Sequence, residues 1–529
     1  MVGVAGKSHA CKTCKRRRVK CDLQQPTCFR CEKANTTCDG YGREPIFVNR
    51  TLSHPFVKVA SVISEAKHAE SKTSHLPLYE EDMRSMISQA TNPSPYIPID
   101  FRRKAVELLR KIYLPKKLVA EGYRERHWHA VGGVYAWLAC LRTLTEKSKA
   151  LDLALLAFCI VQTHVTKTSS VNIEDGLQFY SEAICHYRCE LQDDRKRSRN
   201  ESFATIIVLI TCELFTFQVD QSWRVHAFGI SEILRLRNRS ELPSETWNIL
   251  CSRMRIVCIL DGLTKQQPLF LSSGEWLEIS SSVYFSPIDR LLDIVINIPA
   301  SLARSNALMD TAHPEQHDYE LASILTDFMC VSKQMHIWQH RTKAEGPLIP
   351  YWAVFSQIHN PADDEYASKL FPFALEFDSL DSAITFSFKW SVHLQILTKI
   401  ICIHRWLDNN RLLLPRVHGI FGSNEKQKVH SLHASASNYG NPSTISISFI
   451  KAEADKLSRL LCQCIGYCYR TEMGTLGPQY CRYLLWATRQ FFGLNADYKR
   501  ELEWSLQIKN ITGPGLHAKL DLMELEDNL

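Results

Sequence analysis

Six cysteines near the start of the chain are the side chains best suited to bind a metal. They follow the spacing C-x2-C-x6-C-x6-C-x2-C-x6-C and are Cys11, Cys14, Cys21, Cys28, Cys31 and Cys38. Two cysteines separated by two residues suit one metal ion, because a short turn brings both thiolates onto it. The unit C-x2-C-x6-C occurs twice, 17 residues apart, which indicates two equal half-sites.

The number of ligands decides how the metal is shared. Two tetrahedral zinc ions need eight ligand positions, whereas the six thiolates supply only six. Two sulfurs must therefore bridge the ions, and equal halves make the bridging pair either Cys11 with Cys28 or another symmetric pair. The main alternative is a disulfide framework in a secreted protein. We expect no secretory signal, because residues 1–10 lack an apolar core.

The two half-sites differ in charge. Five of the six residues between Cys14 and Cys21 are basic, against one of six between Cys31 and Cys38. Arginine and lysine bond guanine in the major groove and grip phosphates, so the first half is the better DNA surface. The alternatives are an exposed loop and a nuclear-import signal. The residues expected to contact DNA are Lys12, Lys15, Arg16, Arg17, Arg18 and Lys20.

All the excess positive charge lies in the same segment. The chain has 63 basic and 56 acidic residues, a net charge of +7, and residues 1–50 alone carry 11 basic and 4 acidic side chains. Attraction to nucleic acid is therefore localised to the N-terminus. A protein that recognises RNA usually stacks aromatic side chains on the bases. Only Phe29 and Tyr41 lie near the basic segment, so RNA is the less favoured partner. A zinc module that binds another protein stays open as an alternative.

The segment from Cys11 to Asp22, with Pro26 and the later cysteines, resembles the fungal binuclear zinc-cluster family of transcription factors. The resemblance implies two bound Zn²⁺ ions, with Cys11 and Cys28 as the bridging ligands. It also implies a nuclear transcription factor that reads a CGG-like triplet in double-stranded DNA, often in genes of primary or secondary metabolism. In the family, the positions of Arg17 and Arg18 approach the triplet, and the second is often lysine.

Local structure must hold these residues in place. We expect each half-site to form a short helix between its second and third cysteines, pinned by metal at both ends. Val19 is expected to pack against the cluster.

Four regions are expected along the chain: a zinc cluster (1–42), a flexible linker (43–97), a helical regulatory domain (98–515) and a short acidic-hydrophobic tail (516–529). The linker is rich in Gly, Pro, Ser and Thr, with brief helices expected near 57–70 and 80–89. It shows no sustained heptads, so a zipper homodimer is not supported. The tail carries four acidic residues among leucines, a mixture that can recruit coregulators, although an ordinary helix end is the favoured interpretation.

The region after residue 100 is expected to be an all-α array, because its apolar residues recur at helical spacing. We expect Asp175 and Asn200 to cap two of its helices and residues 408–444 to form a mobile insertion. The pattern Trp223-x-x-His226-x-x-Gly229 makes the region similar to the fungal-specific transcription factor domain, which implies a regulatory role. The expected helices are 131–144, 151–165, 177–191, 202–217, 221–236, 244–263, 286–298, 317–339, 379–406, 446–469 and 479–492.

Catalytic patterns are missing from this region of the sequence. His336 and His340 lie four residues apart on one helical face, but no acidic general base stands beside them. His127 and His129 flank a tryptophan and suggest no better site. We therefore expect no enzyme. No segment reaches the roughly 18–20 uninterrupted apolar residues that a membrane span needs, and the apolar run at 203–217 indicates a buried helix.

Overall fold

The computed structural model divides the chain into two compact units, Met1–Ser74 and His75–Leu529. In the first unit it describes residues 11–38, apart from positions 12, 15, 16, 18, 23, 25 and 26. In the second unit it describes residues 78–91, 99–120, 134–216, 221–236, 244–272, 286–311, 318–345, 349–410, 446–517 and 525. The expected helix at 57–70 and residues 411–444 of the expected insertion (408–444) lie outside these ranges. The expected start of that insertion was wrong, because residues 408 and 409 still belong to helix α18 (Leu380–Asn409).

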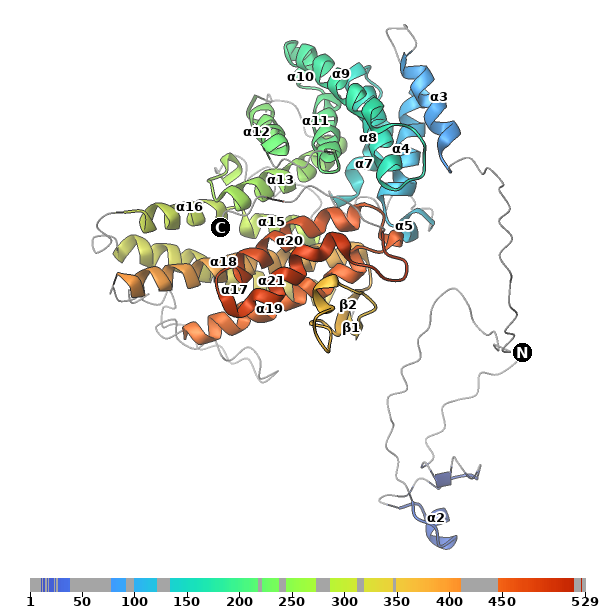
Figure 1. The fold of residues 1–529 in the computed structure, drawn as a ribbon, viewed down its shortest axis with the longest axis vertical. Coiled ribbons are helices and arrows are strands. Elements are labelled where there is room, and N and C mark those ends of the chain that lie inside the picture. The colour runs from blue at the N-terminus through green and yellow to red at the C-terminus, as the bar shows by residue number, and fades with distance from the viewer. Residues whose placement is uncertain are drawn as a thin grey trace. The chain divides into compact units, whose positions relative to one another are not determined.

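The described part of the second unit is helical apart from two short strands (Figure 1). Its first helices are α3 (Glu80–Thr91), α4 (Ile99–Tyr113), α5 (Lys116–Ala120), α7 (Ala136–Cys140), α8 (Lys149–Val165), α9 (Ile173–Leu191), α10 (Asp194–Arg197), α11 (Asn200–Glu213), α12 (Gln221–Leu236) and α13 (Glu245–Lys265). The later ones are α15 (Pro287–Val295), α16 (Ile298–Met309), α17 (Asp318–Glu345), α18 (Leu380–Asn409), α19 (Ile447–Cys468), α20 (Leu476–Phe492) and α21 (Lys499–Leu506). The expected all-α fold is confirmed.

Serine side chains set the start of several long helices. The Ser148, Ser244 and Ser379 side chains each accept the backbone N–H three residues later, which satisfies an otherwise free donor. The expected caps at α9 and α11 were wrong. Asn172 caps α9 and puts Asp175 inside the first turn, while Asn200 is already the first residue of α11.

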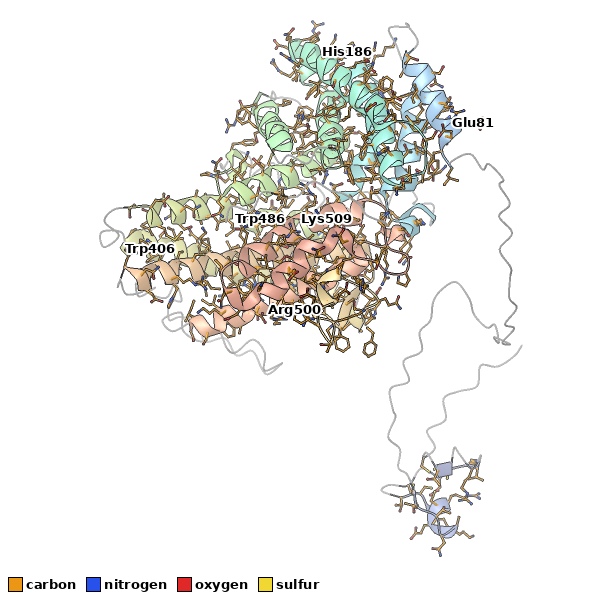
Figure 2. All side chains as sticks on the ribbon, in the orientation of Figure 1. Glu81, His186, Trp406, Trp486, Arg500 and Lys509 are labelled. Atoms are coloured by element: carbon orange, nitrogen blue, oxygen red, sulfur yellow. The ribbon has the colours of Figure 1, made fainter. Side chains whose placement is uncertain are left out.

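The core runs between two groups of helices. In the first, α8 packs against α4, α9 and α11; in the second, α18, α19 and α20 pack against one another. Figure 2 shows Trp486 of α20 within the packed helices, where it is buried, whereas Glu81 lies at the surface. The central helix α18 buries residues on every side, so it carries little periodic signal.

Two strands, β1 (Tyr351–Phe355) and β2 (Phe373–Phe377), form an antiparallel pair that the sequence did not predict. Tyr351 pairs with Phe377 and Phe355 with Phe373. The inner face packs on α19 and α18. The segment YWAVF has no apolar–polar alternation, and its strand character comes from β-branched and aromatic residues. Tyr351 packs against Phe386 and Trp390 of α18, whereas Trp352 and Phe355 are exposed.

Helix α3 falls inside the expected linker, and the helix expected near 80–89 is confirmed. Its Met83 and Met86 side chains are fully buried in the second unit. The Glu80 carboxylate accepts hydrogen bonds from the Ser170 backbone N–H (2.8 Å) and hydroxyl (2.7 Å). These contacts attach α3 to the turn that precedes α9.

The described tail residue Leu525 is also buried against the helices. It lines a cavity of about 70 Å³ together with residues of α11, α13, α15, α18 and α20. That volume is far below the roughly 300–1,000 Å³ of a typical ligand pocket. Separately, none of the described helices combines the length and apolar character needed to cross a membrane.

Candidate metal centre and nucleic-acid interface

The six cysteine sulfurs converge into two overlapping groups of four. One group is Cys11, Cys14, Cys21 and Cys28; the other is Cys11, Cys28, Cys31 and Cys38. Within each group the sulfurs lie no more than 4.8 Å apart. Cys11 and Cys28 belong to both groups, which is the sharing that two four-coordinate ions require of six thiolates.

The distances between the sulfurs fit tetrahedral zinc. Zn–S bonds of about 2.3 Å at tetrahedral angles place two sulfurs about 3.8 Å apart. The Sγ atoms of Cys11 and Cys28 are 3.6 Å apart, and that of Cys28 is 3.6 Å from the Sγ of Cys14. On the other side, the Sγ atoms of Cys11 and Cys31 are 3.8 Å apart. The cysteine sulfurs therefore fit zinc ions in both their spacing and their chemistry.

Backbone hydrogen bonds repeat between the halves with the period of the cysteines. The Cys14 N–H donates to the Cys11 sulfur (3.3 Å), and the Cys31 N–H donates to the Cys28 sulfur (3.4 Å). Each shared sulfur thus accepts one amide from its own half. The repeat of C-x2-C-x6-C therefore extends to the backbone that orients the sulfurs.

The helix of the second half, α2 (Phe29–Lys33), corrects the expectation of a helix between Cys31 and Cys38. It begins one cysteine earlier, because two acceptors receive its first amides. The Cys28 sulfur is one, and the Asp22 carboxylate is the other, accepting from Phe29 (2.9 Å) and Arg30 (3.2 Å). Desolvation opposes the charge on Asp22, but these amides outweigh it and lower the pKa of its carboxyl.

Burial governs the protonation of the metal-free thiols. It raises the pKa of Cys11 to about 12 and also raises the pKa values of Cys14 and Cys28. Without a metal these thiols carry protons at neutral pH. Binding zinc must therefore displace protons, as is usual for thiolate sites.

The expected DNA contacts are only partly described. Arg17 and Lys20 are exposed beside the cluster, while Lys12, Lys15, Arg16 and Arg18 lie outside the described residues. Arg17 donates to the Thr36 hydroxyl (3.2 Å), which joins the two halves. Val19 is 38% exposed, so the expectation that it packs against the cluster was wrong.

Two supporting residues escaped the sequence reasoning. Asp22 starts α2, and the Thr13 hydroxyl donates to the Thr37 carbonyl (3.0 Å), a second link between the halves. Only their positions in the sequence could have indicated these roles: Asp22 directly follows the third cysteine, and Thr13 directly precedes the second.

Residues 9–45 match the fungal Zn(2)-Cys(6) binuclear cluster domain. The chain carries a fungal zinc binuclear cluster. Such a cluster binds two zinc ions, and the two sulfur groups supply the positions for them.

The curated relatives match only a small part of the chain. Arginine metabolism regulation protein II of Saccharomyces cerevisiae is 61% identical over 31 residues, 6% of this chain and 4% of the relative. White-opaque regulator 2 of Candida albicans is 55% identical over 31 residues, 6% of this chain and 7% of the relative. Sterol uptake control protein 2 of Candida albicans is 33% identical over 103 residues, 16% of this chain and 14% of the relative. The matches therefore span at most 14% of these relatives, and no solved structure matches the chain.

We considered His336 and His340 as a metal pair from the sequence and rejected them, and the structure places them in different surroundings. His336 of α17 packs edge-on against His393 of α18, with ring centroids 5.3 Å apart, and His340 is exposed. His127 and His129 lie outside the described residues. The relatives named above are regulators or control proteins, in keeping with a non-enzymatic role.

Proposed function

We propose that this chain is a zinc-dependent, sequence-specific DNA-binding transcription factor that acts in the nucleus. The observation that carries the proposal is the pair of four-sulfur groups that share Cys11 and Cys28. Zinc bound there stabilises a module too small for a core of its own. Relatives named as regulators support the same conclusion.

The residues take the following roles in this proposal. The six cysteines ligate two zinc ions, with Cys11 and Cys28 bridging. Arg17 and Arg18 read a CGG-like triplet in the major groove, because arginine bonds guanine O6 and N7. The other basic residues contact phosphates and set the position of the module on DNA. They are Lys12, Lys15, Arg16 and Lys20.

The remaining regions regulate this module. We assign residues 43–97 as the segment that joins the cluster to the regulatory region, with its helix α3 packed on that region, residues 98–515 as a fungal transcription factor regulatory domain and 516–529 as the tail. Support comes from α12, where His226 of the pattern Trp223-x-x-His226-x-x-Gly229 bonds both Tyr180 of α9 and Glu213 of α11 at 3.0 Å and so ties α12 to these two helices. Coregulators bind this helical region, and a homodimer, if formed, uses an interface other than a zipper.

A direct binding assay tests the proposal. The full-length protein, loaded with zinc, is titrated against a fluorescent duplex that contains CGG and against a shuffled duplex. We expect tighter binding to CGG, loss of binding on chelation, and loss in a Cys14→Ala variant. Cys185→Ala is the matched control, because that cysteine is exposed and far along the sequence from the cluster. Unchanged DNA affinity in Cys14→Ala would contradict the proposal.

A further inference from the structure

The hydrogen bonds of the strand pair fix which backbone groups of β1 face β2. Just outside the strands, the Ser356 N–H donates to the Pro372 carbonyl (2.8 Å), and the Asp378 N–H donates to the Pro350 carbonyl (3.3 Å). These residues continue the register of β1 and β2. Because hydrogen-bonded residues alternate along an antiparallel pair, the even-numbered residues of β1 point their N–H and C=O groups at β2. The odd-numbered residues point theirs at the outer edge of β1.

This outer edge is open within the part of the chain that the structure describes. There the sheet consists of β1 and β2 alone, and no other backbone group bonds the backbone of Tyr351, Ala353 or Phe355. The side chains of these three residues lie on one side of the strand. On that side Tyr351 packs against α18, whereas Ala353 and Phe355 are exposed. The helices therefore cover the start of β1 and leave its middle and its end accessible to another strand.

Strand β1 lacks the features that usually protect an edge. Proteins place charged residues or proline on such a strand, or cover it with another element, but its five residues YWAVF include no charge and no proline. Figure 1 shows the strand pair at the periphery of the second unit. Of the thirteen large apolar side chains that are exposed in the described ranges, five lie in or beside this hairpin: Ile349, Trp352, Phe355, Tyr366 and Phe373. Exposed apolar side chains beside an open edge indicate an interaction site.

The sequence of β1 is complementary to itself when it is read in the opposite direction. Aromatic residues stand at both ends, large apolar residues stand next to them, and the small Ala353 stands at the centre. In an antiparallel second copy with Ala353 opposite Ala353, Tyr351 faces Phe355 and Trp352 faces Val354. Aromatic–aromatic and aromatic–β-branched pairs are favourable across strands. In this register each of the three pairs of edge residues also exchanges two backbone hydrogen bonds.

We propose that the outer edge of β1 is a homodimer interface, at which the β1 strands of two copies pair antiparallel about a twofold axis at Ala353. The two hairpins then form one continuous four-stranded sheet. Backbone hydrogen bonds supply affinity in such strand addition, and side-chain pairs supply specificity. The occupant is a second copy because the pattern of β1 matches itself and a twofold contact uses each favourable pair twice. The interface involves neither the zinc cluster nor DNA, so the inference does not depend on the proposed function.

The first test measures the mass of the full-length protein by sedimentation equilibrium, in reducing buffer with zinc and without DNA. We expect a reversible equilibrium in which the mass approaches twice the 60.7 kDa of one chain as the concentration rises. Specific interfaces of ordinary size bind at about micromolar concentration or more tightly. A wild type that stays monomeric up to about 100 µM, a hundredfold above that limit, would overturn the proposal and leave the edge to a strand of another protein.

Exchange of charge at the axis tests the register. Ala353→Lys and Ala353→Glu each place two like charges opposite one another, which destabilises a strand pair. We expect each variant to raise the dissociation constant of the dimer about tenfold or more. An equal mixture of the two variants places lysine opposite glutamate and should restore dimerisation. Failure of the mixture to dimerise, or dimerisation of Ala353→Lys alone with the wild-type dissociation constant, would contradict the pairing at Ala353.

The matched control is Ala367→Lys, at an exposed alanine in the connection between β1 and β2. It makes the same substitution away from the strand edge and should keep the wild-type dissociation constant. An equal loss in Ala367→Lys and Ala353→Lys would show that added charge, and not its position, weakens the dimer, and would overturn the assignment. Because the Ala353 N–H points away from β2, Ala353→Pro should keep the β1–β2 pair and lose dimerisation. An unchanged circular dichroism spectrum checks that each variant is folded.

Discussion

Removal of a shared cysteine should weaken both zinc ions at once. Cys28 belongs to both sulfur groups, whereas Cys38 belongs to one. A structural zinc ion contributes about 10–16 kcal/mol, or roughly 2.5–4 kcal/mol for each of its four ligands. Since about 1.4 kcal/mol is a factor of ten in affinity, each lost ligand should weaken an ion about 10²–10³-fold. Cys28→Ala should therefore weaken both ions by this factor, and Cys38→Ala only one.

The assay is equilibrium dialysis of the full-length protein against buffers of fixed free zinc, followed by measurement of bound metal. The wild type should hold two ions. At a free zinc concentration where Cys38→Ala retains one ion, Cys28→Ala should retain neither, and the exposed-site control Cys185→Ala should retain both. If Cys28→Ala kept one ion at full affinity, Cys28 would not be a bridging ligand and the reasoning from sulfur sharing would be refuted.

Three further changes should have distinct effects. Arg18→Ala should cost about 1–3 kcal/mol of discrimination at one base pair; an equal loss on every duplex would make Arg18 a phosphate contact. Hydrogen bonds from Ser170 lower the pKa of Glu80 to about 2, so their stabilisation is present above pH 4.5 and lost as pH falls towards 2. Glu80→Gln should lower the melting temperature at pH 7 and weaken the fall in melting temperature as pH drops from 4.5 towards 2. An unchanged fall in this variant would show that Glu80 does not cause it. Leu525→Ala should destabilise the second unit by about 2 kcal/mol or more in urea unfolding, and a loss equal to that of Leu78→Ala, at a residue that is 74% exposed, would contradict the buried contact.

Most of the helices were accessible from the sequence because their apolar residues follow a helical period. The expected helices at 151–165 and 221–236 agree with α8 and α12 to within two residues. The start of α9 was misplaced because two side chains, Asn172 and Asp175, both suit a cap, and only the backbone geometry separates them. The strand pair depends on β2, which packs against α19, a contact distant in sequence.

The cluster was predictable in its ligands and less so in its local backbone. Cysteine spacing alone required shared sulfurs, and the structure brings Cys11 and Cys28 into both groups. The position of α2 depends on Asp22, which reaches across from the preceding segment. The burial of polar residues such as Lys389 and His393 could not be predicted from the sequence, because α18 buries residues on every side.

The most direct test of the central claim is selection of random duplex DNA by the purified full-length protein, first with zinc and then with a chelator. The account predicts enrichment of CGG-like triplets with zinc and no enrichment with the chelator. The spacing between enriched triplets would report whether the protein binds as a monomer or a dimer. Absence of enrichment while two zinc ions stay bound would contradict the account and assign the cluster to protein contact instead.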